Sequence, residues 1–303
     1  MKKDFLTLQA YSGEEIWDML KLARNLKDRR KKRRDLEGKI LAMIFQKPST
    51  RTRLSFEVAM KQLGGDAVYL GWDQIQLGRG ETIADTAQVL GRYVDGIMAR
   101  VFNHRDLEEL AENATIPVIN GLSDRFHPAQ ALSDLLTIWE KIGRLKDVKI
   151  AYLGDGNNVC NSLLIGASKV GTYITVASPL KYRPSIEILE TALKNAEESG
   201  SSVEVTEDPA AAVAEADVVY TDTFVSMGME EEKAERTSAF KPKYQVNAKL
   251  MASTGRRSIF MHCLPAHRGE EVVDEVIDGP ASVVWDQAEN RMHAQKALLS
   301  RLL

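Results

Sequence analysis

The sequence is poor in cysteine and has no long apolar run. Only Cys160 and Cys263 occur in 303 residues, which excludes a disulfide framework and fits a reducing cytoplasm. No stretch reaches the roughly 18 uninterrupted apolar residues of a membrane helix. The first five residues, MKKDF, lack the apolar segment of a signal peptide. We therefore expect a cytoplasmic protein with no membrane partner.

A global excess of basic charge is also absent, since the formal net charge is −3. This excludes bulk attraction to nucleic acid or to an anionic membrane. One local block, residues 29–34 (RRKKRR), has six consecutive bases. Asp35 and Glu37 dilute its charge and no aromatic residues alternate with it, so a solvated helix end is favoured over nucleic-acid binding or a targeting signal.

The glycine-rich loops that bind nucleotides are missing or incomplete. No Walker loop occurs, which disfavours ordinary nucleotide hydrolysis. Residues 154–158 (GDGNN) begin like a dinucleotide fingerprint, but Val159 stands at the third glycine position. The end of the next strand offers Ser178 and Pro179 instead of a ribose-binding acid. These departures count against a nicotinamide dehydrogenase built on residues 149–177.

What the chain does have is a regular alternation of apolar runs and helical patterns. Helical patterns fall near 13–28, 52–63, 81–92, 105–112 and 129–142, with strand candidates at 40–45, 67–70, 96–101 and 116–119. The second half adds strand candidates at 148–153, 172–177, 203–205, 217–221, 258–261 and 282–284. Strands separated by helices predict parallel sheets. We expect two Rossmann-like α/β domains, 1–142 and 143–286, with a C-terminal helix at 287–303 packing back across the domains.

The densest polar cluster, residues 47–53 (KPSTRTR), follows the apolar run 40–45. A helix start offers backbone N–H groups to an anion, hydroxyls add neutral donors, and arginines grip two oxygens at once. The alternative is a helix cap followed by solvated arginines. Five consecutive polar donors favour a phosphate site.

Other polar residues also follow predicted strands, where ligands collect in parallel sheets. His127 either caps a helix or donates to a carbonyl oxygen, while the Gln130 amide contacts an NH2 group. Cys263 is either a small buried residue or a site residue. A zinc site of Cys160, His262, Cys263 and His267 is disfavoured because the spacing fits no common zinc motif. The strand-end residues are Arg100, His127, Gln130, Asn157, Asn158, Asp222, His262 and Cys263.

Three motifs together resemble the signature set of the aspartate/ornithine carbamoyltransferase family: residues 49–53 (STRTR), 127–130 (HPAQ) and 262–265 (HCLP). Their order and separation match, and the resemblance extends over nearly the whole chain. Aspartate enzymes of the family carry His-Pro-Leu-Pro at the third motif, whereas ornithine enzymes carry the cysteine form. Residues 222–228 (DTFVSMG) also resemble the Asp-x-x-x-Ser-Met-Gly loop of the ornithine branch. Glu81-Thr82 stands where many relatives have Glu-Ser, and the loop 76–80 is less typical.

The resemblance implies that carbamoyl phosphate and L-ornithine give L-citrulline and phosphate, with no metal or cofactor. Phosphate would contact Ser49, Thr50, Arg51 and Arg291. The carbonyl oxygen would contact Thr52, Arg100 and His127, and the carbamoyl nitrogen would contact Gln130 and the Leu264 carbonyl. Ornithine would contact Asn158, Asp222, Ser226 and Met227, with Cys263 receiving or aligning the attacking amine. The 1–142 domain and the C-terminal helix would bind carbamoyl phosphate, and the 143–286 domain ornithine.

The same resemblance implies a homotrimer in which Gln76 enters the site of a neighbouring subunit. Three alternatives remain at this point: another acceptor, such as putrescine, N-acetylornithine or aspartate; a nicotinamide dehydrogenase; and a noncatalytic binding or assembly subunit. The sequence leaves the biosynthetic and degradative directions open.

Overall fold

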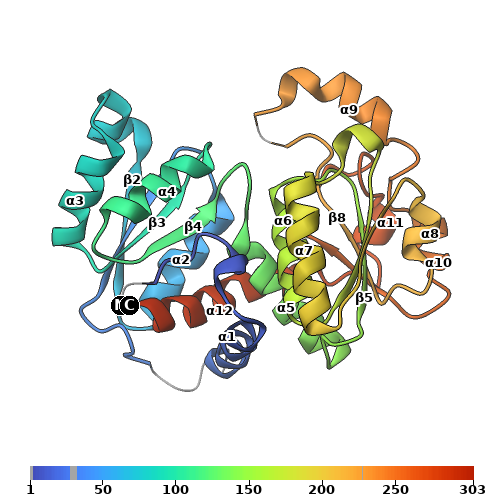
Figure 1. Ribbon diagram of the computed structural model, residues 1–303, viewed down its shortest axis with the longest axis horizontal. Helices are drawn as coiled ribbons and strands as arrows, with labels where there is room; N and C mark the ends of the chain where they lie inside the picture. Colours follow the sequence, from blue (N-terminus) through green and yellow to red (C-terminus); the bar gives the residue numbers. More distant parts are fainter. Residues whose placement is uncertain (1–2, 28–32, 227) are drawn as a thin grey trace. The chain divides into compact units, whose positions relative to one another are not determined.

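The computed structural model describes residues 3–27, 33–226 and 228–303. The chain forms two compact units, unit 1 (Met1–Leu136 with Asn290–Leu303) and unit 2 (Thr137–Glu289). Each unit contains one parallel sheet with helices against it (Figure 1). The predicted α/β class with two Rossmann-like domains is therefore confirmed. Residues 29–32 of the basic block lie outside the described residues.

Unit 1 has a four-stranded sheet in the order β2-β1-β3-β4. Its strands are β1 (Ile40–Phe45), β2 (Asp66–Gly71), β3 (Gly96–Arg100) and β4 (Val118–Leu122). Its helices are η1 (Leu8–Ala10), α1 (Gly13–Leu26), α2 (Thr50–Gln62), η2 (Trp72–Gln74), η3 (Gln76–Arg79), α3 (Ile83–Tyr93) and α4 (His104–Asn113). Apolar residues of α3 and α4 pack on β1 and β3 in one core cluster that includes Ile44, Ala87, Ala99 and Leu107.

Unit 2 has a five-stranded sheet in the order β7-β6-β5-β8-β9. Its strands are β5 (Lys149–Leu153), β6 (Tyr173–Ala177), β7 (Val203–Thr206), β8 (Val218–Thr221) and β9 (Ile259–His262). Helices α6 (Asn158–Lys169) and α7 (Ile186–Ser199) lie on one face, and α8 (Pro209–Val213), α10 (Ala248–Ala252) and α11 (Asp274–Ile277) on the other (Figure 1). The remaining helices are η4 (Leu180–Tyr182), η5 (Glu230–Glu232) and α9 (Lys233–Phe240).

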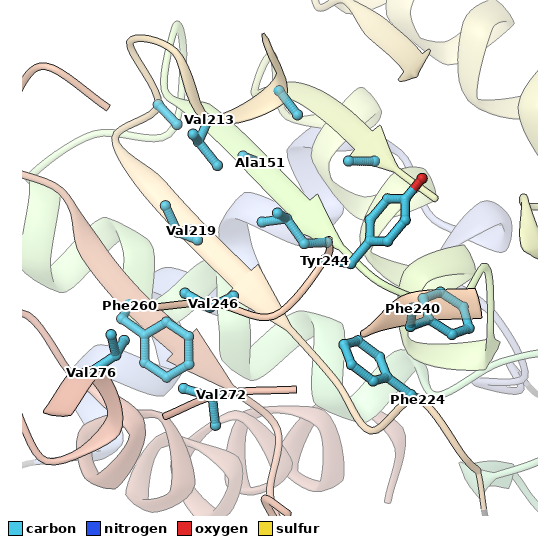
Figure 2. Close-up of a cluster of buried hydrophobic side chains, with 14 of the residues drawn as sticks. Ala151, Val213, Val219, Phe224, Phe240, Tyr244, Val246, Phe260, Val272 and Val276 are labelled. Atoms are coloured by element: carbon cyan, nitrogen blue, oxygen red, sulfur yellow. The ribbon is translucent and has the colours of Figure 1, made fainter. Parts of the chain in front are cut away.

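An aromatic cluster anchors α9 to the core of unit 2. Phe224 and Phe240 stack with ring centroids 4.8 Å apart, and Phe240 also contacts Tyr182 and Tyr244 (Figure 2). These rings are buried and continue into the valine-rich core that Val219, Val246 and Val272 form. Because Phe224 follows Asp222 by two residues, this packing fixes the loop after β8.

Two helices contribute residues to both units. Helix α5 (Pro128–Ile142) changes unit after Leu136, and α12 (Val284–Leu302) changes unit after Glu289. The later part of α12 is fastened inside unit 1, where Lys296 Nζ donates to the Leu26 carbonyl at 2.7 Å and to Gln62 Oε1 at 3.1 Å. The predicted C-terminal helix that packs back is thus confirmed.

One predicted strand is wrong. Residues 282–284 do not form a strand, because Ser282 makes only an isolated bridge to Phe260 and Val284 is already the first residue of α12. The β-branched pair Val283-Val284 favours a strand locally. A helix forms from Val284 instead, and the Val283 carbonyl accepts the Gln287 N–H of its first turn at 2.9 Å.

Among the described residues, no helix is both long and apolar enough to span a membrane.

Candidate active site

The topology of each sheet brings two polar loops together. In unit 1 the chain crosses from β2 past β1 to β3, so the loops after β1 and β3 leave the sheet as neighbours. In unit 2 it crosses from β7 past β5 to β8, so the loops after β5 and β8 are neighbours. Such switch points are where open parallel sheets bind ligands. In unit 1 the residues from Ser49 to Thr52 follow β1 and Arg100 ends β3, and in unit 2 Asn158 and the loop from Asp222 follow β5 and β8. The other predicted site residues follow β2, β4 or β9 or lie on α12.

In unit 1 the loop after β1 ends at the start of α2. Ser49 is the N-cap, and its Oγ accepts the Thr52 N–H at 3.1 Å. Capping uses a lone pair of the hydroxyl, so its O–H can still donate to an anion. The helix cap and the phosphate site, which the sequence presented as alternatives, are therefore compatible.

The two arginines of the STRTR motif have different surroundings. The Arg53 guanidinium lies 4.0 Å from the centroid of the Tyr69 ring. Arg51, two residues earlier, is half-buried in the first turn of α2. Arg53 is held by stacking on Tyr69 of the edge strand β2. Arg51 is therefore the guanidinium of this motif that is suited to a ligand.

Two further arginines of unit 1 are almost fully buried. Arg291, from α12, is 4% exposed, and its Nη2 donates to Thr52 Oγ1 at 2.7 Å. Arg100, the last residue of β3, is 8% exposed. Gln46 ties the β1 and β3 loops together, since its N–H donates to the Arg100 carbonyl at 2.8 Å and its Oε1 accepts the Phe102 N–H at 2.6 Å. Buried cations of this kind favour an anionic ligand.

His127 lies just before α5 and is 5% exposed. Burial, with the nearby charges of Arg291 and Arg100, holds the pKa of His127 well below its usual 6.5. The imidazole is therefore neutral at physiological pH and has one N–H to donate. A neutral donor beside two guanidiniums suits an oxygen that gains negative charge only during a reaction.

Gln130 is on the first turn of α5 and is also buried. Its Nε2 donates to Asp134 Oδ1 at 2.8 Å. This bond fixes the amide orientation and leaves Oε1 as the atom that can accept from an NH2 group. Gln76, at the start of η3, is instead exposed.

In unit 2 the loops after β5, β8 and β9 meet through one carboxylate. Asp222 is 7% exposed, and its Oδ1 accepts the Cys263 Sγ–H at 2.9 Å and the Thr223 N–H at 2.7 Å. Its Oδ2 accepts Asn157 Nδ2 at 2.7 Å. Asn157 also caps α6, because its Oδ1 accepts the N–H groups of Val159 and Cys160. The thiol and the carboxylate thus form one polar pair.

Asn157 was predicted only as a strand-end loop residue, without a specific ligand contact. The predicted ornithine contact is Asn158, which is half-buried as the first residue of α6. The Asn-Asn pair was a recognisable turn or cap signal, but only the structure shows that Asn157 bonds the Asp222 carboxylate. Ser226 is half-buried in the loop after β8. Met227 lies outside the described residues.

A buried ion pair that sequence reasoning missed ties α9 to the loop after β5. Arg236 of α9 donates from Nη1 to Asp155 Oδ2 at 2.9 Å and from Nε to Glu232 Oε2 at 2.8 Å. Burial raises the pKa of Asp155 to about 6, although the Arg236 charge opposes it. Arg236 is also desolvated, yet the two carboxylates more than offset that and raise its pKa. Asp155 is therefore the strained member of the pair, because desolvation of its carboxylate outweighs the attraction of the guanidinium.

Gly156 of the GDGNN loop is required by close packing within the chain itself. A Cβ on Gly156 would lie 2.2 Å from Pro184 N and 2.5 Å from Arg183 C. The Gly156 N–H also donates to the Tyr182 carbonyl at 2.7 Å. The 182–184 segment thus occupies the close approach that a dinucleotide pyrophosphate would need.

Within the described part of the chain, two groups of residues could be considered as metal ligands: Asp222, His262 and Cys263, and His267, Glu270 and Glu271. In the first group both ring nitrogens of His262 are engaged, by the Leu264 N–H at 2.8 Å and by Glu271 Oε1 at 3.2 Å. In the second, Glu270 pairs with Lys233 at 3.3 Å. Neither donor set is arranged for a metal.

The predicted residues thus fall into two sets, one in each unit. Unit 1 contains a cationic set of hydroxyls, arginines and amides: Ser49, Thr50, Arg51, Thr52, Gln76, Arg100, His127, Gln130 and Arg291. Unit 2 contains an acidic, thiol-bearing set: Asn158, Asp222, Ser226, Cys263 and Leu264.

Comparison with known proteins agrees with this division. Residues 3–140 match the sequence profile described as the aspartate/ornithine carbamoyltransferase carbamoyl-P binding domain. Residues 146–302 match the profile of the Asp/Orn binding domain of the same family. The second profile includes most of α12, whose later residues the structure assigns to unit 1.

Similar curated proteins have the same family name. The ornithine carbamoyltransferase of Pyrococcus horikoshii is 59% identical over 99% of this chain and 96% of its own. The anabolic ornithine carbamoyltransferase of Pyrococcus furiosus is 58% identical over the same shares.

Solved structures extend the likeness to the fold. Ornithine carbamoyltransferase from Pyrococcus furiosus superposes with a TM-score of 0.95 at 58% identity, over 99% of this chain and 96% of that one. Ornithine transcarbamoylase from Giardia lamblia still gives 0.91 at 35% identity, over 100% and 98%. The chain belongs to the aspartate/ornithine carbamoyltransferase family.

Proposed function

We propose that the protein transfers the carbamoyl group of carbamoyl phosphate to the side-chain amine of L-ornithine, which gives L-citrulline and phosphate. The observation that carries the proposal is the division of charge between the units. Unit 1 offers buried guanidiniums beside a helix start, and unit 2 offers a buried carboxylate bonded to a thiol. The first set suits a phosphorylated substrate and the second an amine. The names of the relatives support ornithine over putrescine or N-acetylornithine.

In this proposal residues 1–142 and the helix at 287–303 bind carbamoyl phosphate. Ser49, Thr50, Arg51 and Arg291 hold the phosphate and neutralise the charge it gains on leaving. The carbonyl oxygen becomes an oxyanion as the amine attacks, and Thr52, Arg100 and His127 donate to it. Gln130 Oε1 and the Leu264 carbonyl accept from the carbamoyl NH2 and so orient the plane of the group.

Residues 143–286 bind ornithine. Asn158, Asp222, Ser226 and Met227 hold its α-amino and carboxylate groups, and Cys263 aligns the reacting amine. This amine resembles that of lysine, with a pKa near 10.4 in solution, so it must first lose a proton. Its nitrogen lone pair then forms the new C–N bond, the C–O bond to phosphate breaks, and phosphate leaves with that electron pair. The amine releases a second proton to give the neutral ureido product.

The proposal includes a homotrimer in which the exposed Gln76 of one subunit reaches the site of the next. It includes a cytoplasmic location, for which the support is that Cys160 and Cys263 form no disulfide. The word anabolic in the name of the Pyrococcus furiosus relative favours the biosynthetic direction.

A panel of amine acceptors tests the function. Purified protein is mixed with carbamoyl phosphate and L-ornithine, putrescine, N-acetyl-L-ornithine, L-aspartate or no amine, and ureido product and phosphate are both measured. We expect one phosphate per citrulline with ornithine, and only the blank rate of phosphate release with the others. If another acceptor has a higher kcat/KM than ornithine, that acceptor is the substrate. Absence of product with all four acceptors would contradict the proposal.

A further inference from the structure

His262, the last residue of β9, lies at the centre of a network of hydrogen bonds that includes the loop after this strand. The imidazole is fully buried. Its backbone N–H donates to Gln287 Oε1 at 2.9 Å, and Gln287 Nε2 donates to the Tyr220 hydroxyl at 3.1 Å. The position of His262 is therefore fixed from the first turns of α12 and from β8.

The two ring nitrogens of His262 have opposite roles. The Leu264 N–H donates to Nδ1 at 2.8 Å, so Nδ1 carries no hydrogen. The hydrogen of the neutral ring is then on Nε2, which faces Glu271 Oε1 at 3.2 Å. Glu271 is also fully buried, and an imidazole N–H is a suitable donor to its carboxylate. The carboxylate thus selects the tautomer that can accept from Leu264.

The same dyad holds the loop at a second point. Glu271 Oε1 also accepts the backbone N–H of His267 at 2.5 Å. Glu271 itself is held by the backbone bond from Val246 N to its carbonyl at 2.9 Å. Residues 263–267 are therefore fastened near both ends to one buried pair, while the Cys263 thiol is fixed by Asp222.

Leu264 needs this support because its backbone is strained. Its φ is 58°, in the left-handed region that a leucine rarely adopts because its Cβ then crowds the backbone. The hydrogen bond from Leu264 N to His262 holds the residue in this conformation. The direction of the carbonyl that follows depends on it.

We propose that His262 and Glu271 are positioning residues, which through the tautomer of His262 fix the Leu264 carbonyl for the carbamoyl nitrogen. This rests on the proposed function, because it concerns the carbonyl that contacts carbamoyl phosphate. His262 is not a ligand or a base in this arrangement, since both of its nitrogens are engaged within the loop.

Two substitutions at His262 separate this role from mere packing. In His262→Asn the side-chain oxygen replaces Nδ1 and can still accept from Leu264 N–H. In His262→Gln the amide replaces Nε2 and that acceptor is lost. We expect the Gln variant to lose about 10²-fold in kcat/KM for carbamoyl phosphate, the scale expected for a displaced contact. The Asn variant should keep most of the activity, and the KM for ornithine should change little in either.

Glu271 supplies the matching pair. Glu271→Gln keeps an acceptor oxygen for His262 and should be mild, whereas Glu271→Met removes it and should resemble His262→Gln. The unfolding midpoint of each variant is measured alongside its kinetics, so that the rates refer to folded protein. Equal kinetic losses in His262→Asn and His262→Gln, or losses in unfolding midpoint alone, would overturn the proposal.

The tautomer can be measured without activity. In protein labelled with 15N histidine, the His262 signals are assigned by their disappearance in His262→Asn. We expect an unprotonated Nδ1 and a protonated Nε2, and the opposite tautomer would overturn the inference even if citrulline is formed. If the wild type makes no citrulline but shows this tautomer, the proposed function fails and the loop geometry stands.

Discussion

The buried charges beside the predicted site residues differ between the two units. Unit 1 buries Arg100 and Arg291 beside a neutral imidazole, whereas unit 2 buries the carboxylates of Asp155, Asp222 and Glu271. Each of these three carboxylates accepts hydrogen bonds from within its own unit. Burying charge is costly unless it is compensated. The sign of the buried charge beside the site residues therefore supports the proposed division, with phosphate in unit 1 and the amine in unit 2.

The comparison also separates two ways of helping the reaction. In the proposed function, the cations of unit 1 stabilise charge that grows on the phosphate and the carbonyl oxygen. The acid network of unit 2 is proposed to orient the amine and to attract it while protonated. Substitutions of site residues in unit 1 should therefore lower the use of carbamoyl phosphate. Substitutions in unit 2 should mainly affect the use of ornithine or the stability of the loops proposed to bind it.

The largest effect is expected from Arg51→Ala. The guanidinium is proposed to make charge-assisted bonds to the phosphate, and losing two of them at about 2 kcal/mol each lowers kcat/KM for carbamoyl phosphate by about 10³-fold. The KM for ornithine should change little. Steady-state kinetics with each substrate varied in turn measures both.

Arg53→Ala is the matched control, because it removes the same charge two residues away. Arg53 stacks on Tyr69, so its loss should affect stability more than kinetics. If the two variants lose kcat/KM equally, the effect is one of general charge and the assignment of Arg51 is wrong.

The second prediction concerns the buried acid of unit 2. The pKa of Asp155 is raised from 3.8 to about 6, so the folded protein binds this proton more tightly than the unfolded chain does. The contribution to the free energy of unfolding is complete below pH 3.8 and is lost as the pH rises through about 6. It amounts to about 3 kcal/mol. The Asp155→Asn side chain binds no proton in this pH range. The free energy of unfolding of the wild type minus that of the variant should therefore fall by about this amount between about pH 4 and 7.

Denaturant unfolding at a series of pH values measures this difference. Asp95→Asn in unit 1 is the control of opposite sign. Although burial opposes it, the bonds from Lys39 and the Ile40 N–H hold the pKa of Asp95 below its usual 3.8. Its contribution is present above that pH and lost only below it. If the difference in free energy of unfolding between wild type and Asp155→Asn does not change between pH 4 and 7, the Asp155–Arg236 pair is not strained.

Much of this architecture could be predicted from the sequence. The apolar runs predicted the parallel sheets, and the STRTR motif was recognisable because its donors are adjacent in the chain. The 282–284 strand was wrong because local β propensity does not show that a helix begins at Val284. The contacts that the sequence did not show join distant residues: Arg236 meets Asp155 across 81 positions and Asn157 meets Asp222 across 65. Only the fold brings such pairs together, and a single sequence gives no signal for them.

The third prediction is Cys263→Ser in unit 2. A serine hydroxyl can still bond Asp222, but it is shorter than the thiol and places its donor differently. We expect the KM for ornithine to rise about 5- to 10-fold, the value of about one hydrogen bond, with the KM for carbamoyl phosphate unchanged.

Cys160→Ala tests whether loss of the other cysteine of this unit has the same effect as Cys263→Ser. Cys160 is fully buried on α6, and burial raises the pKa of its thiol well above the usual value, so it stays protonated. Its loss should leave both KM values unchanged. A larger rise for carbamoyl phosphate than for ornithine in Cys263→Ser would remove Cys263 from the amine side.

The smallest effect is expected from Ser49→Ala, which asks whether the start of α2 differs from an ordinary helix cap. Ser12 is the natural comparison, since its Oγ accepts the Glu15 N–H at 3.1 Å and it caps α1 in unit 1. Either alanine variant should lose about 1 kcal/mol of unfolding free energy. Only Ser49→Ala should also raise the KM for carbamoyl phosphate, by about 5-fold, because its O–H donates to the ligand. Ser49→Thr keeps both functions and should restore both values. Equal kinetics in Ser49→Ala and Ser12→Ala would mean that Ser49 is a cap alone, and that Thr50 and the arginines form the phosphate site without it.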